Sequence, residues 1–179
     1  NLCAILMEIA YMLYVAQEGC QFEHRDFRVD NIMTRKISES TRSRHINGHV
    51  YKYPSTDISC YFIDFGMARV MLEDKQYIAC DCMQPDHKFN PSHDLQSLLC
   101  TLDEDYEEEL STSARRMRKW IRNICNSLYG SVHTHHPDYD TLDKDARKHI
   151  LTEQVRVCRF TEFEPYNVMR SLATFLKSC

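Results

Sequence analysis

Two short polar clusters, each beside an apolar run, constrain this chain more than any other feature. The first has the pattern H-R-D-x-x-x-x-N over 24–31, and the second is D-F-G over 64–66. Asp26 and Asn31 stand five positions apart, so one loop can turn both side chains toward one cleft. Asp64 ends an apolar run rich in β-formers, and a strand there can bring its carboxylate to the same cleft. The two clusters therefore predict one polar site with carboxylate and amide oxygens at the edge of that cleft.

The composition bounds the class of protein. With 179 residues, 43% hydrophobic and 27% charged, the chain is long enough for one globular domain or one lobe of a larger protein. The formal charge of -4 and the pI near 6.1 give no reason to expect nucleic acid or an anionic membrane as a partner. Glu8 interrupts the apolar N-terminal residues, so we predict neither a signal peptide nor a membrane span. We expect an intracellular protein whose oligomeric state is left open.

Nine cysteines are scattered along the chain, several of them within apolar periodic segments. Because buried cysteine behaves as a small hydrophobe, we expect reduced core thiols rather than a disulfide framework. A zinc site could be drawn from Cys80, Cys82, His87 and His93. The C-x-C spacing is not that of a common structural zinc pair and no second cysteine pair follows, so no metal is predicted there.

Periodicity predicts a mainly α fold with a small β element. The expected helices lie at 1–16, 92–102, 110–129, 145–157 and 165–176. Short strands are expected to start at Asn31 and to cover 58–63. Between them, Asn47-Gly48 within the basic passage 35–57 predicts a solvated surface hairpin.

Three segments have weaker patterns. The stretch 70–91 is irregular and broken by prolines, and no regular element is predicted there. The acidic run 103–109 is expected to be a solvated loop. His133, His135 and His136 stand beside a proline, and we interpret them as exposed loop histidines.

With these motifs, the chain resembles the C-terminal lobe of the eukaryotic-like protein kinase superfamily. Phe22-Glu23 before the H-R-D motif is similar to haspin, and D-L-x-S-L over 94–98 is similar to casein-kinase-one-like kinases. The sequence has no clustered glycines and no V-A-I-K-type lysine, so the N-terminal lobe is expected to be absent from this chain.

The resemblance also implies a domain organisation. A protein-kinase C-lobe is expected over 1–179, with the recognisable helix, catalytic loop, D-F-G and buried-aspartate helix over 1–102. Additional C-terminal helices are expected over 103–179, and the basic hairpin over 35–57 is expected to be an insertion.

The resemblance assigns chemical roles to four residues. Asp26 takes the place of the catalytic aspartate, which accepts the proton of the substrate hydroxyl. Arg28 stands where a lysine usually contacts the γ-phosphate, and a guanidinium can bind two phosphate oxygens at once. Asn31 and Asp64 match the Mg²⁺ ligands. The implied cofactors are ATP and Mg²⁺, and the implied reaction is phosphorylation of Ser or Thr in a protein substrate.

Three further residues are expected to support this site. In the family, the residue at the place of His24 packs beneath the metal-binding aspartate. Arg25 matches an arginine that often receives an activation-loop phosphate. Asp94 resembles the buried helix aspartate that tethers the backbone of the catalytic loop.

Two other functions fit parts of the pattern. A pseudokinase could keep these residues and act as a scaffold. A small-molecule phosphotransferase of the aminoglycoside-kinase type would explain the short interval from Asp64 to Asp94, which has no A-P-E motif. Arg25, Arg28 and the complete D-F-G favour a protein kinase. The 179 residues alone are expected to have negligible activity.

Overall fold

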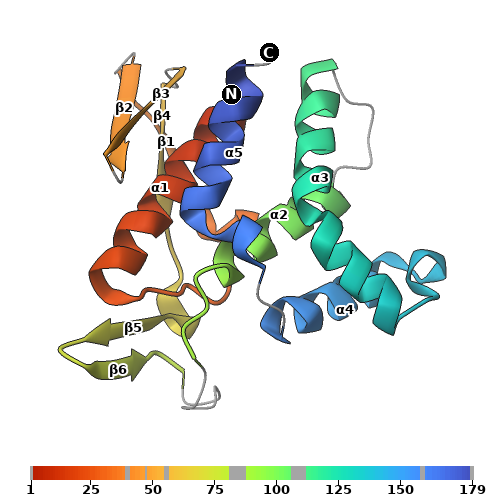
Figure 1. Cartoon of the computed structure of the whole chain (residues 1–179). Helices are drawn as coiled ribbons and strands as arrows, with labels where there is room; N and C mark the ends of the chain where they lie inside the picture. The colour runs from red at the N-terminus through yellow and green to blue at the C-terminus, as the bar shows by residue number, and fades with distance from the viewer. Residues whose placement is uncertain are drawn as a thin grey trace.

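The structure, a computed structural model, describes residues 2–38, 41–46, 48–54, 57–80, 88–105, 112–157 and 160–177. The helices are α1 (Leu2–Cys20), α2 (His93–Asp105), α3 (Thr112–His135), α4 (Lys144–Val157) and α5 (Pro165–Lys177). The strands are β1 (Ile32–Lys36), β2 (Thr41–Ile46), β3 (His49–Pro54), β4 (Ile58–Phe62), β5 (Arg69–Leu72) and β6 (Lys75–Ile78). Four short 3₁₀ turns complete the fold: η1 (Val29–Asn31), η2 (Phe65–Met67), η3 (Tyr139–Thr141) and η4 (Thr161–Phe163). The prediction of a mainly α fold with a small β element is confirmed (Figure 1).

The first helix is a core element. α1 packs against α5 on one side and against β4 on another. Six of its apolar side chains are buried, and most of the others are partly buried against the core: the buried ones are Ala4, Leu6, Met7, Ile9, Ala10 and Leu13. Contrary to the expectation from sequence, its 19 residues, with a mean hydropathy of 1.3, are long and apolar enough to cross a membrane. Its contacts within the fold account for these apolar residues, because the core helix of a globular domain meets the same criterion.

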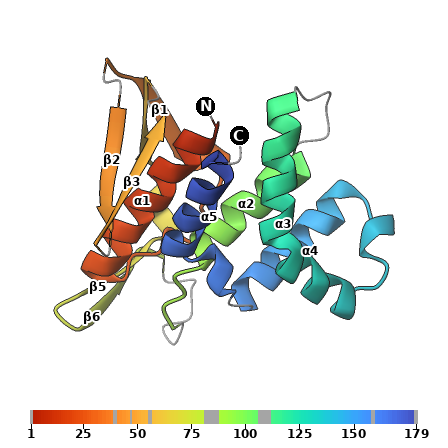
Figure 2. The same ribbon diagram turned by 45° about the horizontal axis from the view of Figure 1, so that its top comes forward.

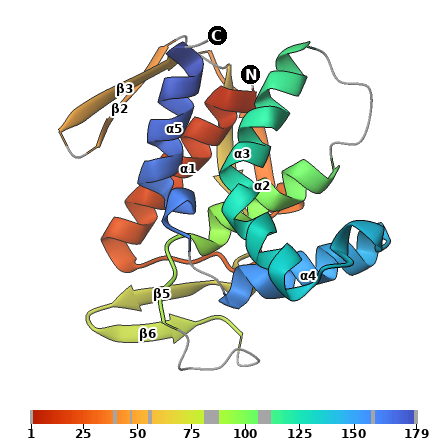
Figure 3. The same ribbon diagram turned by 45° about the vertical axis from the view of Figure 1, so that its right-hand side comes forward.

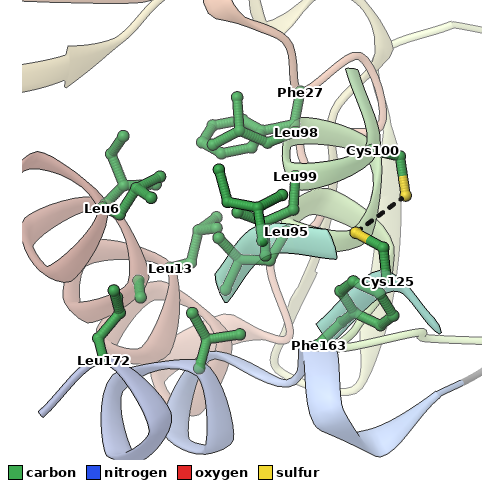
Figure 4. Close-up of a cluster of buried hydrophobic side chains, with 14 of the residues drawn as sticks. Leu6, Leu13, Phe27, Leu95, Leu98, Leu99, Cys100, Cys125, Phe163 and Leu172 are labelled. Atoms are coloured by element: carbon green, nitrogen blue, oxygen red, sulfur yellow. Dashed lines mark hydrogen bonds between the residues drawn. The ribbon is translucent and has the colours of Figure 1, made fainter. Parts of the chain in front are cut away.

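α2 lies between two groups of elements. On one side of it are α1 and α5 with the strands, and on the other are α3 and α4, as Figures 1 and 2 show. In the view of Figure 3, α3 crosses in front of α2. Leu95, Leu98 and Leu99 of α2 are almost wholly buried, and they join side chains from α1, α5 and the catalytic-type loop in one core (Figure 4). Such burial on all sides fixes α2 relative to the rest of the described chain.

The strands form three separate antiparallel pairs, β1 with β4, β2 with β3 and β5 with β6. The predicted hairpin around Gly48 is present, with Ile46 opposite His49 and a φ of +75° at Gly48, a value that favours glycine. It is more firmly anchored than a solvated hairpin. Ile46 is buried, and Arg44 forms an ion pair of 3.0 Å with the buried Glu8 of α1.

Three parts of the chain differ from the sequence-based expectations. The segment 70–91 contains a regular hairpin, β5–β6, whose turn residues Glu73 and Asp74 have φ values of 49° and 62°. The acidic run 103–109 was expected to be a solvated loop, but its first residues belong to α2, which ends at Asp105, and Asp103 is completely buried. The remainder, 106–109, lies outside the described residues. His133, His135 and His136 are exposed, as expected, but His133 and His135 lie on the last turn of α3 and only His136 follows the helix.

The described cysteines follow the expectation, except for Cys80. Cys3, Cys20, Cys60, Cys100 and Cys125 are reduced. Cys80 is disulfide-bonded, against the expectation of reduced thiols. Cys82 and His87, two of the four residues considered above for a zinc site, lie outside the described residues.

Candidate active site

The loop that follows α1 is held by the first turn of α2. Asp94 is 1% exposed, and its two carboxylate oxygens accept hydrogen bonds from the backbone N–H groups of His24 (2.8 Å) and Arg25 (2.9 Å). Arg25 has a φ of 69°, a conformation that side-chain-bearing residues seldom adopt. A buried carboxylate with two backbone donors can hold such a strained turn, because charge-assisted hydrogen bonds are stronger than neutral ones.

Asp26 and Asn31 are joined across the same loop. The Asn31 amide nitrogen donates to the Asp26 carbonyl oxygen at 2.8 Å and to its Oδ2 at 3.0 Å. The side chain of Asp26 is 37% exposed, so it faces away from the hydrocarbon core. These two hydrogen bonds use the donors of the Asn31 amide and leave its carbonyl oxygen as the end that can bind a cation.

The pairing of β1 with β4 brings Asp64 beside Asn31. Ile32 lies opposite Phe62, and the next residues continue the pairing, with the Ile63 N–H donating to the Asn31 carbonyl oxygen at 3.0 Å. Asp64 follows directly and is exposed, with a φ of 60° and a ψ of 69°. The two predicted metal ligands therefore leave neighbouring strand ends.

Gly66 gives the Asp64 carboxylate the room that it occupies. The Gly66 N–H donates to Asp64 Oδ1 at 3.3 Å, and a Cβ added at Gly66 would lie only 3.2 Å from that oxygen. A larger residue at this position would crowd the carboxylate.

His24 lies under the D-F-G turn. It is completely buried, its Nε2 is 2.8 Å from the carbonyl oxygen of Ile63, and its ring lies 5.4 Å from that of Phe65. These contacts support the backbone immediately before Asp64. Because the His24 side chain is fully buried, it cannot contact a substrate, and its role is to support the D-F-G turn.

Arg28 is on the exposed side of the loop. Its Nε lies 3.5 Å from Asp26 Oδ1, and its side chain is 50% exposed. An exposed pair of this kind is held weakly, so the guanidinium is able to turn toward another anion.

The sequence analysis missed a buried ion pair next to the loop. Glu23 Oε2 accepts a hydrogen bond of 3.0 Å from Arg69 Nη1, and the backbones of the two residues are also paired. Glu23 Oε1 accepts from the N–H of Asn90, which ties the segment before α2 to the loop. Burial raises the pKa of the Glu23 carboxyl despite the nearby Arg69. The signal in the sequence was a glutamate between the apolar Phe22 and the H-R-D motif.

The donor set fits a cation that also binds phosphate. In the described ranges no group of three or more His, Cys, Asp or Glu side chains could hold a metal by itself. Asn31 and Asp64 supply two hard oxygen ligands, and Mg²⁺ characteristically takes one or two protein ligands and completes its shell with phosphates and water. The residues present therefore suit a Mg²⁺–nucleotide complex better than a closed metal site.

The helical lobe, the tethered loop and the adjacent D-F-G turn define a domain of the protein-kinase type. A family model described as "Haspin like kinase domain" matches residues 1–97. The chain belongs to this family of haspin-like kinase domains, which supports a protein-kinase-related function and, in general terms, ATP, a divalent metal and a protein substrate.

Proposed function

We propose that this chain is the catalytic-loop half of a protein kinase that transfers the γ-phosphoryl group of ATP to Ser or Thr. The observation that carries the proposal is the hydrogen bond from Ile63 to Asn31, which sets Asp64 beside the Asp26–Asn31 pair. Such a cluster of one amide and two carboxylates has little value for packing, since Asp64 is exposed and the Asp26 side chain is 37% exposed.

Each residue has a defined task in this proposal. The Asp26 carboxylate accepts a hydrogen bond from the substrate hydroxyl and orients its oxygen toward the γ-phosphorus. It takes up the hydroxyl proton as the new P–O bond forms, while the bond from the γ-phosphorus to the β,γ-bridging oxygen breaks and ADP leaves. Asn31, through its amide nitrogen, fixes the position of that carboxylate. Orientation matters more than basicity because the transition state of phosphoryl transfer is loose. Bound Mg²⁺ would neutralise charge on the phosphates, with Asn31 and Asp64 as its protein ligands.

Arg28 is proposed to contact the γ-phosphate. In the structure its guanidinium pairs with Asp26, and a triphosphate bound at this site would be a more highly charged anion for it. A guanidinium can donate two parallel hydrogen bonds to phosphate oxygens. Arg25 is proposed to receive an activation-loop phosphate.

The nucleotide also needs a lobe that covers it. We propose that the chain acts within a protein that supplies a glycine-rich loop and a strand lysine, and that the protein is intracellular. The 179 residues by themselves are expected to turn over ATP negligibly, because their four glycines form no phosphate-covering loop. Robust turnover by these residues alone would contradict this view.

The experiment is a transfer assay with the protein that carries this chain and an N-terminal lobe. Labelled phosphate should pass from ATP to a protein, and either EDTA or Asp64→Ala should abolish transfer while the fold is retained. Transfer to a metabolite with none to protein would instead establish a small-molecule kinase, a reading that the short 64–94 interval favours. Partner binding without any transfer would establish a pseudokinase.

A further inference from the structure

Two buried thiols face each other between α2 and α3, away from the proposed active site. The Sγ atoms of Cys100 and Cys125 are 3.8 Å apart, and the residues are 1% and 0% exposed (Figure 4). Neither is in a disulfide, and 25 residues separate them in the sequence. The proposed phosphotransfer reaction uses neither thiol.

Cys100 also borders a small pocket between α2 and α4. The cavity volume is about 20 Å³, so the pocket has room for a molecule of about the size of water. Lys144 and Lys148 of α4 contribute to the wall, and Leu151 and Val155 make much of the rest apolar. Since Cys100 borders this pocket and Cys125 does not line it, Cys100 is the thiol that we expect a small oxidant to reach first.

The sulfur atoms need only a short movement to bond. A disulfide has an S–S distance of about 2.05 Å, so the two atoms must approach by somewhat under 2 Å. Rotation of the two side chains about χ1 can supply much of this. Cys60, on β4, is another buried thiol of the fold.

We propose that Cys100 and Cys125 form a peroxide-sensitive dithiol site that closes to a disulfide between α2 and α3. The Cys100 thiolate attacks one oxygen of hydrogen peroxide, the S–O bond forms, and the O–O bond breaks to release water after protonation. Cys125 then loses its proton and attacks the sulfur of Cys100. The S–S bond forms as the S–O bond breaks, and a second water leaves, so two thiols and one peroxide become one disulfide and two waters.

The cross-link would act on the helix that supports the catalytic-type loop. α2 carries Cys100 and also Asp94, which holds the backbone of His24 and Arg25. A disulfide to α3 restricts how far α2 can move or open locally relative to the C-terminal helices. The oxidised protein is therefore expected to melt at a higher temperature than the reduced protein.

Mass spectrometry can test the site directly, because trypsin isolates each thiol. Cleavage at Lys and Arg leaves Cys100 as the only cysteine of peptide 89–115 and Cys125 as the only cysteine of peptide 123–144. The folded protein is treated with hydrogen peroxide, the remaining thiols are alkylated under denaturing conditions, and the digest is analysed without reduction. The expected major product at these cysteines is the pair 89–115 linked to 123–144, which disappears on reduction.

Variants separate this pair from general thiol oxidation. Cys100→Ser should abolish the linked peptide, while Cys60→Ser, which removes another buried thiol, should leave its yield unchanged. The proposal is overturned if wild-type Cys100 and Cys125 stay alkylatable after the other thiols have reacted. It is equally overturned if Cys100 ends as a sulfinic acid or is linked to a different cysteine.

Discussion

The side-chain amide nitrogen of Asn31 donates hydrogen bonds to two oxygens of Asp26, the backbone carbonyl oxygen at 2.8 Å and the carboxylate Oδ2 at 3.0 Å. The same residue is joined through its backbone to Ile63, which directly precedes Asp64. Asn31 is thus the link between the catalytic-type loop and the D-F-G turn. A substitution in either cluster is expected to alter the position of the other, because both are hydrogen-bonded to Asn31.

Asp94 should be the residue on which the shape of the loop depends most. Asp94→Ala removes the acceptor of two backbone N–H groups, those of His24 and Arg25, and leaves them unsatisfied in a buried place. Each such loss costs about 1–3 kcal/mol, so the free energy of unfolding should fall by at least about 2 kcal/mol. Urea denaturation followed by circular dichroism measures this. Asp94→Asn keeps one acceptor and should cost less, and equal stability of Asp94→Ala and wild type would refute the tether.

The β2–β3 hairpin should owe its position to Arg44. Its guanidinium donates to both oxygens of Glu8, at 3.0 and 3.2 Å, and lies 4.8 Å from the ring centre of Tyr11. Arg44→Ala leaves a carboxylate that is only 8% exposed, and we expect a loss of about 1–3 kcal/mol in thermal or urea unfolding.

An exposed ion pair in the same region gives the control for Arg44. Lys36 and Asp57 are 3.6 Å apart, and both side chains are largely in water. Lys36→Ala should leave stability unchanged within error. If Arg44→Ala proved as mild as Lys36→Ala, the hairpin would not be anchored through this pair.

Through Tyr129, the free energy of unfolding is expected to depend on pH above about pH 10. Its hydroxyl donates to the buried Asp103 at 2.9 Å, and burial, together with the nearby Cys100 and Asp103, raises its pKa well above the usual value near 10. In the unfolded chain this tyrosine ionises above about pH 10, whereas in the folded protein it stays protonated, so its contribution to stability is lost as the pH rises beyond 10. The stability difference between wild type and Tyr129→Phe should therefore shrink from pH 8 to pH 11. A difference that stays constant over this range would contradict the raised pKa.

The helices and the two polar clusters could be predicted from the sequence because their signals are local. Apolar residues at helical spacing gave α1, α2, α4 and α5 to within a few residues. Gly48 marked the turn of one hairpin. The family resemblance read from H-R-D and D-F-G is confirmed by the match over 1–97.

The parts that were wrong depend on tertiary contacts or on unusual turn residues. The β5–β6 turn uses Glu73 and Asp74 at positive φ, where glycine or asparagine would have been the signal. Asp103 looked solvated within an acidic run, but Tyr129, Arg118 and Arg122 on α3 surround it. These partners of Asp103 come close only because α2 packs against α3. That packing is a tertiary contact, which local sequence patterns do not indicate.

The most direct measurement compares Asp26→Asn with Asp30→Asn in the protein that carries this chain and an N-terminal lobe. The two aspartates lie on the same loop, and each change removes one negative charge, but Asp30 is exposed and has no role in the proposed reaction. The single-turnover rate of phosphate transfer should fall about 10²–10⁴-fold in Asp26→Asn, since an amide orients the substrate hydroxyl through a weaker hydrogen bond and takes up no proton. The rate should be unchanged in Asp30→Asn. Equal rates in wild type and a folded Asp26→Asn variant would contradict the account.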